Sequence, residues 1–155
     1  RMKRILYPLV LALLCALAPA RAADGLPERF DPARDAAADV ARAVALAQAQ
    51  GKRVLVDVGG EWCPWCHVLD RFFDTHPQVK ALREEAYVWV KVNWSPANRT
   101  ERLLSQWPKI KSYPHLFVLD AYGALVHSQA SAELESGKDY DPQRMTAFLA
   151  RYRGP

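Results

Sequence analysis

The chain has 155 residues, of which half are apolar and a quarter are charged. This composition is typical of a globular domain and argues against disorder, and the length suits one domain rather than two. The formal net charge is +4, but the whole excess lies in the first 22 residues, which contain Arg1, Lys3, Arg4 and Arg21 and no acidic residue. The rest of the chain has no basic excess to neutralise phosphates, so we expect no nucleic-acid binding.

Residues 1–22 have the pattern of a cleaved secretory signal peptide. A positive start is followed by an unbroken apolar run over residues 9–18, and Ala20-Arg21-Ala22 matches the cleavage pattern. The apolar stretch is short for a membrane span, which needs about 20 residues, although an uncleaved anchor is the open alternative. Cleavage after residue 22 would leave a domain over residues 23–155, which we expect to be secreted into a bacterial periplasm.

The next part of the chain alternates helical and extended patterns. Asp-Pro at residues 31–32 is a start signal for a helix that Gly51 would end. Residues 54–58 form a short apolar, β-branched run, which predicts a buried strand. A second helix is predicted from about Cys63, and a second strand over residues 86–92.

The same alternation continues to the end of the chain. Ser-Pro at residues 95–96 predicts the start of a third helix, and residues 115–119 and 124–127 predict two strands of a hairpin. Residues 128–140 are polar and predict a loop, and Asp-Pro at residues 141–142 predicts the last helix. This order indicates a single α/β domain, with a central mixed sheet flanked by helices.

Cys63 and Cys66 are the two cysteines left after removal of the first 22 residues, because Cys15 lies in the apolar run. A disulfide that closes so small a loop adds little stability to a fold, so we expect the pair to have a chemical rather than a stabilising role. Pro64 suits the first helical position and makes Cys63 the N-cap, where backbone N–H groups and the helix dipole favour a thiolate. Cys63 is therefore the candidate nucleophile. Cys66, one turn deeper, is the candidate resolving thiol.

Residues 54–66, Val-Leu-Val-Asp-Val-Gly-Gly-Glu-Trp-Cys-Pro-Trp-Cys, resemble the active-site strand and motif of the thioredoxin superfamily. The resemblance extends over about residues 52–127 and is nearest to small secreted thioredoxin-like domains with a W-C-x-W-C-H or W-C-x-x-C motif. It implies a thioredoxin fold and exchange of disulfides with protein thiols. Substrate would be bound as a mixed disulfide on Cys63 and released by Cys66, without a cofactor.

The resemblance also assigns roles to residues outside the cysteine pair. It implies that Asp57 lies beneath the resolving cysteine beside Lys91, and that Pro114 is a cis-proline. A carboxylate in an apolar strand is costly to bury, so Asp57 is either a proton relay for Cys66 or a structural acid satisfied by Lys91. The candidate substrate-binding residues are Trp62, which could equally be packing support, Pro64, Trp65, Tyr113 and Pro114.

Two departures from the thioredoxin pattern leave the direction of electron flow open. The pair between the cysteines is Pro64-Trp65 rather than Gly-Pro, and Tyr113 replaces a branched aliphatic residue before Pro114. The expected partners are substrate protein thiols or disulfides and a redox partner that resets the pair, either a membrane electron carrier or an oxidant. We expect the protein to be a monomer.

Three alternative functions use the same residues. Cys63-x-x-Cys66-His67 matches the attachment pattern of c-type haem, with Met145 as a possible distal ligand, but the predicted strands disfavour a small cytochrome. A zinc site would need about four ligands, and there is no second cysteine pair, so we expect no metal. A non-catalytic binding module of the same fold is the third alternative, although both motif cysteines are present.

Overall fold

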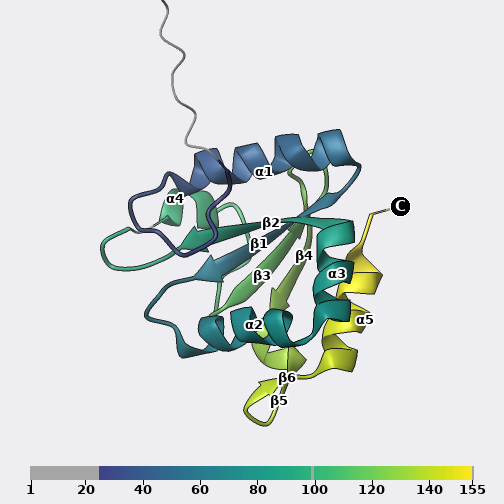
Figure 1. The fold of residues 1–155 in the computed structure, drawn as a ribbon. Helices are drawn as coiled ribbons and strands as arrows, with labels where there is room; N and C mark the ends of the chain where they lie inside the picture. Colours follow the sequence, from purple (N-terminus) through teal and green to yellow (C-terminus); the bar gives the residue numbers. More distant parts are fainter. Residues whose placement is uncertain (1–24, 99, 155) are drawn as a thin grey trace, which may run out of the picture.

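A mixed sheet of four strands forms the centre of the fold (Figure 1). The computed structural model describes residues 25–98 and 100–154, so the predicted signal peptide lies outside the described residues. The sheet order is β2-β1-β3-β4; β1 and β2 are parallel, and the other neighbouring pairs are antiparallel. The strands are β1 (Arg53–Gly59), β2 (Tyr87–Asn93), β3 (His115–Leu119) and β4 (Leu125–Ala130). The predicted α/β fold class is confirmed.

Helices cover both faces of this sheet and make a three-layer domain (Figure 1). On one face lie α1 (Ala36–Gln50) and the short α4 (Glu101–Leu104), and on the other lie α2 (Pro64–Thr75), α3 (Pro77–Ala86) and α5 (Pro142–Tyr152). No helix in the described ranges is long and apolar enough to cross a membrane.

Alternation along β1 decides which layer each of its side chains enters. Val54, Val56 and Val58 pack in the core beneath α1, whereas Leu55 packs among residues of α2, α3 and α5. Asp57 is two residues after Leu55 in the strand, so its carboxyl group is directed to the same face, toward the α2 layer. The strand pattern thus places one charged group under the helix that carries both cysteines.

Two predicted helix starts are wrong. The side chain of Asp35, not Asp31, accepts a hydrogen bond at the start of α1, and Asp31 instead closes a local turn with the backbone N–H of Ala33. Ser95 likewise closes a turn with Asn98, and the third helix spans only Glu101–Leu104. Asp-Pro and Ser-Pro stabilise turns as readily as helix starts, and the local pattern does not distinguish the two.

Two further segments differ from their predictions. The helix predicted from about Cys63 is present as α2, but a further helix that was not predicted, α3, begins at Pro77, because proline suits a first helical position. Residues 128–140, predicted as a loop, include the end of β4, a 3₁₀ turn over Ser131–Leu134 and a small hairpin of β5 (Glu135–Ser136) and β6 (Asp139–Tyr140). The predicted caps Gly51 and Asp141 are confirmed.

Candidate functional site

The cysteine pair lies where β1 ends and α2 begins. Cys63 is the N-cap of α2, with Pro64 at the first helical position, and its Sγ accepts a hydrogen bond of 3.2 Å from the backbone N–H of Cys66. The two Cα atoms are 5.3 Å apart and the sulfurs form a disulfide. Both residues are buried. The predicted geometry of a nucleophile at a helix N-terminus, with a second sulfur one turn deeper, is present.

Gly59 is required for the sulfur of Cys66 to reach this position. A Cβ atom built on Gly59 would collide with Cys66 Sγ and would also lie against the ring of Phe30. The strand must therefore end in a residue without a side chain, because the disulfide and the ring occupy that space. The Gly-Gly pair before the motif was the available signal for this close approach.

Asp57 and Lys91 meet beneath the helix, and a third charged residue joins them. Lys91 Nζ donates to Asp57 Oδ2 at 3.0 Å and to Asp70 Oδ1 at 2.7 Å. Asp57 is fully buried, and its Oδ1 has no hydrogen-bond partner among residues 25–98 and 100–154. Asp70 was not predicted, although its position four residues after Cys66 places it on the same face of the helix.

Burial and charge act in opposite directions on this group. Burial raises the pKa of Asp57 above its ordinary value, and the nearby ammonium of Lys91 only partly opposes it. For Lys91, burial lowers the pKa, but the carboxylates of Asp57 and Asp70 outweigh burial and raise it. The arrangement favours a charged lysine beside a buried carboxyl group that holds a proton more tightly than usual.

The predicted substrate-binding residues divide into two groups. Trp62 is 49% exposed and its ring meets that of Tyr113 edge-on, with centroids 5.4 Å apart. Trp65 lies elsewhere, edge-on to Tyr140 of β6. Pro114 is buried, and the peptide bond before it is cis.

Trp94 completes the aromatic group on the Trp62 side. Its ring stacks on that of Tyr113, with centroids 5.3 Å apart, and its carbonyl oxygen accepts a hydrogen bond of 2.8 Å from Trp62 Nε1. Sequence reasoning missed Trp94, which directly follows β2. Trp62 is thus half exposed to solvent, while its ring packs on Tyr113 and its Nε1 donates a hydrogen bond to Trp94.

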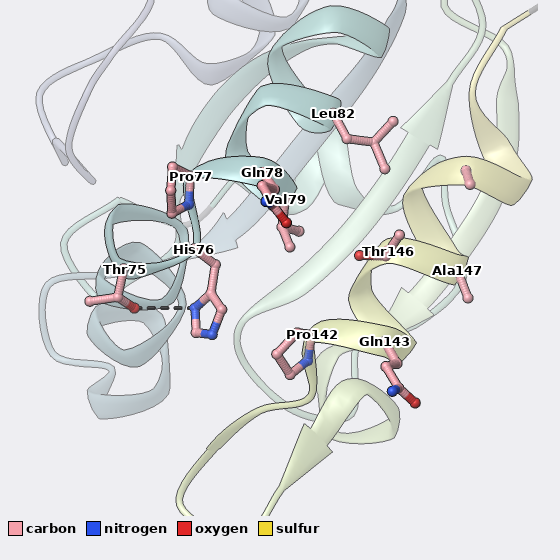
Figure 2. Close-up of a pocket in the computed structure, with 11 residues that line it drawn as sticks. Thr75, His76, Pro77, Gln78, Val79, Leu82, Pro142, Gln143, Thr146 and Ala147 are labelled. Atoms are coloured by element: carbon pink, nitrogen blue, oxygen red, sulfur yellow. Dashed lines mark hydrogen bonds between the residues drawn. The ribbon is translucent and has the colours of Figure 1, made fainter.

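A cavity of about 470 Å³ continues from this aromatic group toward α4. Its wall includes Trp94 and Tyr113 and the apolar side chains of Leu104, Trp107 and Ile110. A larger cavity, of about 690 Å³, lies between the α2–α3 junction and α5, where the hydroxyl of Thr75 contacts the imidazole of His76 (Figure 2). None of the predicted site residues lines the larger cavity, so its size does not connect it with the cysteine chemistry.

The residues considered as haem or zinc ligands have other surroundings in the structure. Met145 is fully buried in the apolar core between α5 and the sheet. His67 is exposed, with Nε2 2.8 Å from the carbonyl oxygen of Glu61. Within the part of the chain that the structure describes, no three His, Cys, Asp or Glu residues gather as a metal site.

The thioredoxin-like family profile matches residues 35–121, more than half of the chain. The chain belongs to the thioredoxin-like family. Among solved structures it resembles a disulphide isomerase from Xylella fastidiosa Temecula1, with a TM-score of 0.68 and 24% identity over 83% of this chain and 98% of that one.

A second similar structure is the oxidised C-terminal domain of DsbD from Neisseria meningitidis, with a TM-score of 0.57 and 18% identity over 81% of this chain and 99% of that one. No curated protein matches the sequence. At these identities the structural likenesses establish the fold. The thioredoxin-like family includes disulfide oxidoreductases, and this chain has the cysteine pair of such proteins at disulfide distance.

Proposed function

We propose that this protein is a secreted thiol–disulfide oxidoreductase that exchanges disulfides with protein substrates through Cys63 and Cys66. The observation that carries the proposal is the Cys63–Cys66 disulfide at the N-terminus of α2, the helix whose Asp70 binds Lys91 together with Asp57. A stabilising disulfide would close a longer loop, whereas a pair three residues apart at a helix N-terminus suits reversible exchange.

The exchange balances as a two-electron transfer. In the reducing direction, the Cys63 thiolate attacks a substrate disulfide, one substrate sulfur leaves as a thiolate, and a mixed disulfide forms on Cys63. Cys66 then loses its proton and attacks Cys63 Sγ, which releases the second substrate thiolate and forms the Cys63–Cys66 disulfide. Oxidation of a substrate dithiol is the reverse sequence. A separate redox partner, a membrane electron carrier or an oxidant, resets the pair.

Asp57 is the proposed acceptor of the Cys66 proton. Its carboxyl group lies in the layer beneath α2, and its Oδ1 has no partner among the described residues. Lys91 holds the other oxygen and links the buried group to Asp70, which is 39% exposed at its side chain. A buried acid with a raised pKa accepts a proton more readily than an ordinary carboxylate.

The proposed substrate-binding surface is the aromatic group beside Cys63. Trp62 and Tyr113 offer apolar area to an unfolded segment, and the backbone beside Pro114 would pair with an extended substrate by strand addition. Pro64 and Trp65 form the other side of the motif. The cavity toward α4 would accept an apolar substrate side chain near the target cysteine.

Secretion is proposed from residues 1–22 alone. Cleavage after Ala22 would release a domain over residues 23–155 into the periplasm. Mass spectrometry of the protein from the soluble periplasmic fraction tests this proposal. A chain that begins at Ala23 is the expected result, and an intact N-terminus in the membrane fraction would favour an anchor.

Trapping of mixed disulfides tests the chemistry. Cys66→Ser should accumulate covalent complexes with substrate proteins that disappear on reduction, because the resolving thiol is absent. Cys63→Ser should form none and should lose disulfide-exchange activity, because the attacking thiol is absent. Full activity of Cys63→Ser would refute the mechanism.

The reduction potential of the pair decides the direction. Trp62 and Trp65 flank the disulfide, so tryptophan fluorescence in glutathione buffers should report its redox state. A potential near about −270 mV would indicate a reductant, and one of about −120 to −180 mV an oxidant or isomerase. A pair that does not titrate would contradict the proposed function.

A further inference from the structure

Phe30 packs against the redox pair from a distant part of the sequence. It lies in the N-terminal strap, defined here as residues 25–35, which precedes α1. The residue is 3% exposed and forms an apolar cluster with Cys63 and Cys66. The strap is tied to α1 and to its own start, because Arg34 donates to Asp39 and to the carbonyl oxygen of Gly25.

The space for this ring is created by Gly59. A Cβ on Gly59 would lie 3.1 and 3.3 Å from Phe30 Cζ and Cε1, and would collide with Cys66 Sγ. The edge of the ring and the sulfur of Cys66 therefore adjoin the same point at the end of β1. The ring occupies volume that a side chain at position 59 would otherwise fill.

Two contacts hold Phe30 at this point. Its backbone N–H donates to Glu61 Oε1 at 3.1 Å, which ties the strap to the loop just before Cys63. Lys91 Nζ lies 4.1 Å from the centroid of the Phe30 ring, a favourable cation–π distance. The ring thus packs in one cluster with Cys63 and Cys66 and also lies against the ammonium that binds Asp57.

We propose that Phe30 is a positioning residue that shields Cys66 and keeps its surroundings free of water. The inference rests on the proposed function and deepens it, because a shielded resolving thiol loses its proton to Asp57 rather than to solvent. Water at this point would solvate the thiolate directly and would screen the charges of Asp57 and Lys91. A small reagent would also reach Cys66 before substrate has bound to Cys63.

The test measures how fast iodoacetamide modifies Cys66 in the reduced Cys63→Ser protein, with peptide mass spectrometry to follow the modification at Cys66. Adding Phe30→Ala should accelerate the modification by about tenfold, because thiol reactivity follows exposure and thiolate fraction. The pH of half-maximal modification should also fall. Phe30→Ala leaves every charged group of the Asp57 network and of the strap contact unchanged: Asp57 on β1, Lys91 on β2, Asp70 on α2, Arg83 on α3 and Glu61 in the loop.

Two controls separate shielding from general loss of packing. Phe148→Ala truncates an equally buried phenylalanine on α5, and it should leave the rate and the pH midpoint of Cys66 modification unchanged. Phe30→Leu keeps an apolar cover and should restore slow modification. An unchanged rate in Phe30→Ala, or an equal acceleration in Phe148→Ala, would overturn the proposal.

A milder variant keeps the proposal testable if Phe30→Ala does not fold. Glu61→Ala removes the acceptor for the Phe30 N–H and leaves the ring intact, so it should accelerate modification by about threefold at high pH, where the thiol is fully ionised and the lost charge does not change the thiolate fraction. An unchanged rate in that variant would count against the proposal. Alkylation needs no substrate protein, so its outcome is independent of whether disulfide exchange is found.

Discussion

Asp57 and Lys91 lie opposite each other across the parallel pair of β1 and β2, and the ammonium of Lys91 is 3.0 Å from Asp57 Oδ2. The same ammonium is 2.7 Å from Asp70 Oδ1. Two ionised carboxylates with one ammonium would leave a net negative charge that is partly buried. A proton on Asp57 makes the group neutral, which is the physical reason that burial raises the pKa of this residue.

The first prediction concerns stability. Between the ordinary Asp pKa of 3.8 and the raised pKa of Asp57, the folded protein binds more protons than the unfolded protein. The contribution of Asp57 to stability is therefore complete below the ordinary value and is lost as pH rises through the folded pKa. Asp57→Asn should remove this decline, measured by urea unfolding over about pH 4 to 8. An identical pH dependence in both proteins would contradict the assignment.

The second prediction concerns the rate of exchange. Asp57→Asn should slow release of substrate from the mixed disulfide by about 100-fold near neutral pH, because the proton acceptor of Cys66 is lost. The protein should remain folded, and the rate should recover at higher pH, where the thiol ionises without help. Asp74→Asn changes an exposed carboxylate on α2, the helix that carries Cys66, and should leave the rate of substrate release unchanged. An unchanged rate–pH profile in Asp57→Asn would leave Asp57 a structural acid.

The third prediction concerns substrate binding at the aromatic group. Trp62→Ala should raise KM for a protein disulfide by about tenfold, equivalent to about 1.4 kcal/mol, and should leave the rate with a small disulfide nearly unchanged. Trp107→Ala, in the wall of the adjoining cavity, should affect only substrates with an apolar side chain near the cysteine. Tyr122 is highly exposed on the β3–β4 turn and offers the control. Tyr122→Ala should change neither the KM for a protein disulfide nor the rate with a small disulfide.

The fourth prediction concerns His115, the first residue of β3. Burial lowers its pKa from 6.5 to about 4, and its Nε2 lies 2.8 Å from Ser128 Oγ. The unfolded protein binds the proton more readily, so the contribution to stability is present above pH 6.5 and is lost as pH falls toward about 4. His115→Gln should lose less stability on acidification than the unchanged protein in urea titrations. The exposed His67→Gln should behave like the unchanged protein.

The cysteine site was predictable because its chemistry is local. A cysteine followed by proline after an apolar strand specifies an N-cap, and the next cysteine follows one turn later. The apolar run of β1 was also visible, so a charged residue at position 57 within it indicated a buried, unusual carboxyl group. Lys91 and Pro114 could be assigned only through the family resemblance, because no local pattern links them to residues about 30 and 50 positions earlier.

The sequence by itself determined the four strands of the central sheet, the cysteine geometry and the α/β class, because periodicity and capping depend on neighbours within a few residues. Only the tertiary structure decided that Phe30, Asp70 and Trp94 belong to the site. Phe30 packs with Cys63 and Cys66, which follow it by 33 and 36 positions, because Gly59 leaves space for its ring. Such packing depends on how the layers of the fold meet, and the sequence near each residue does not predict which distant residue it will contact.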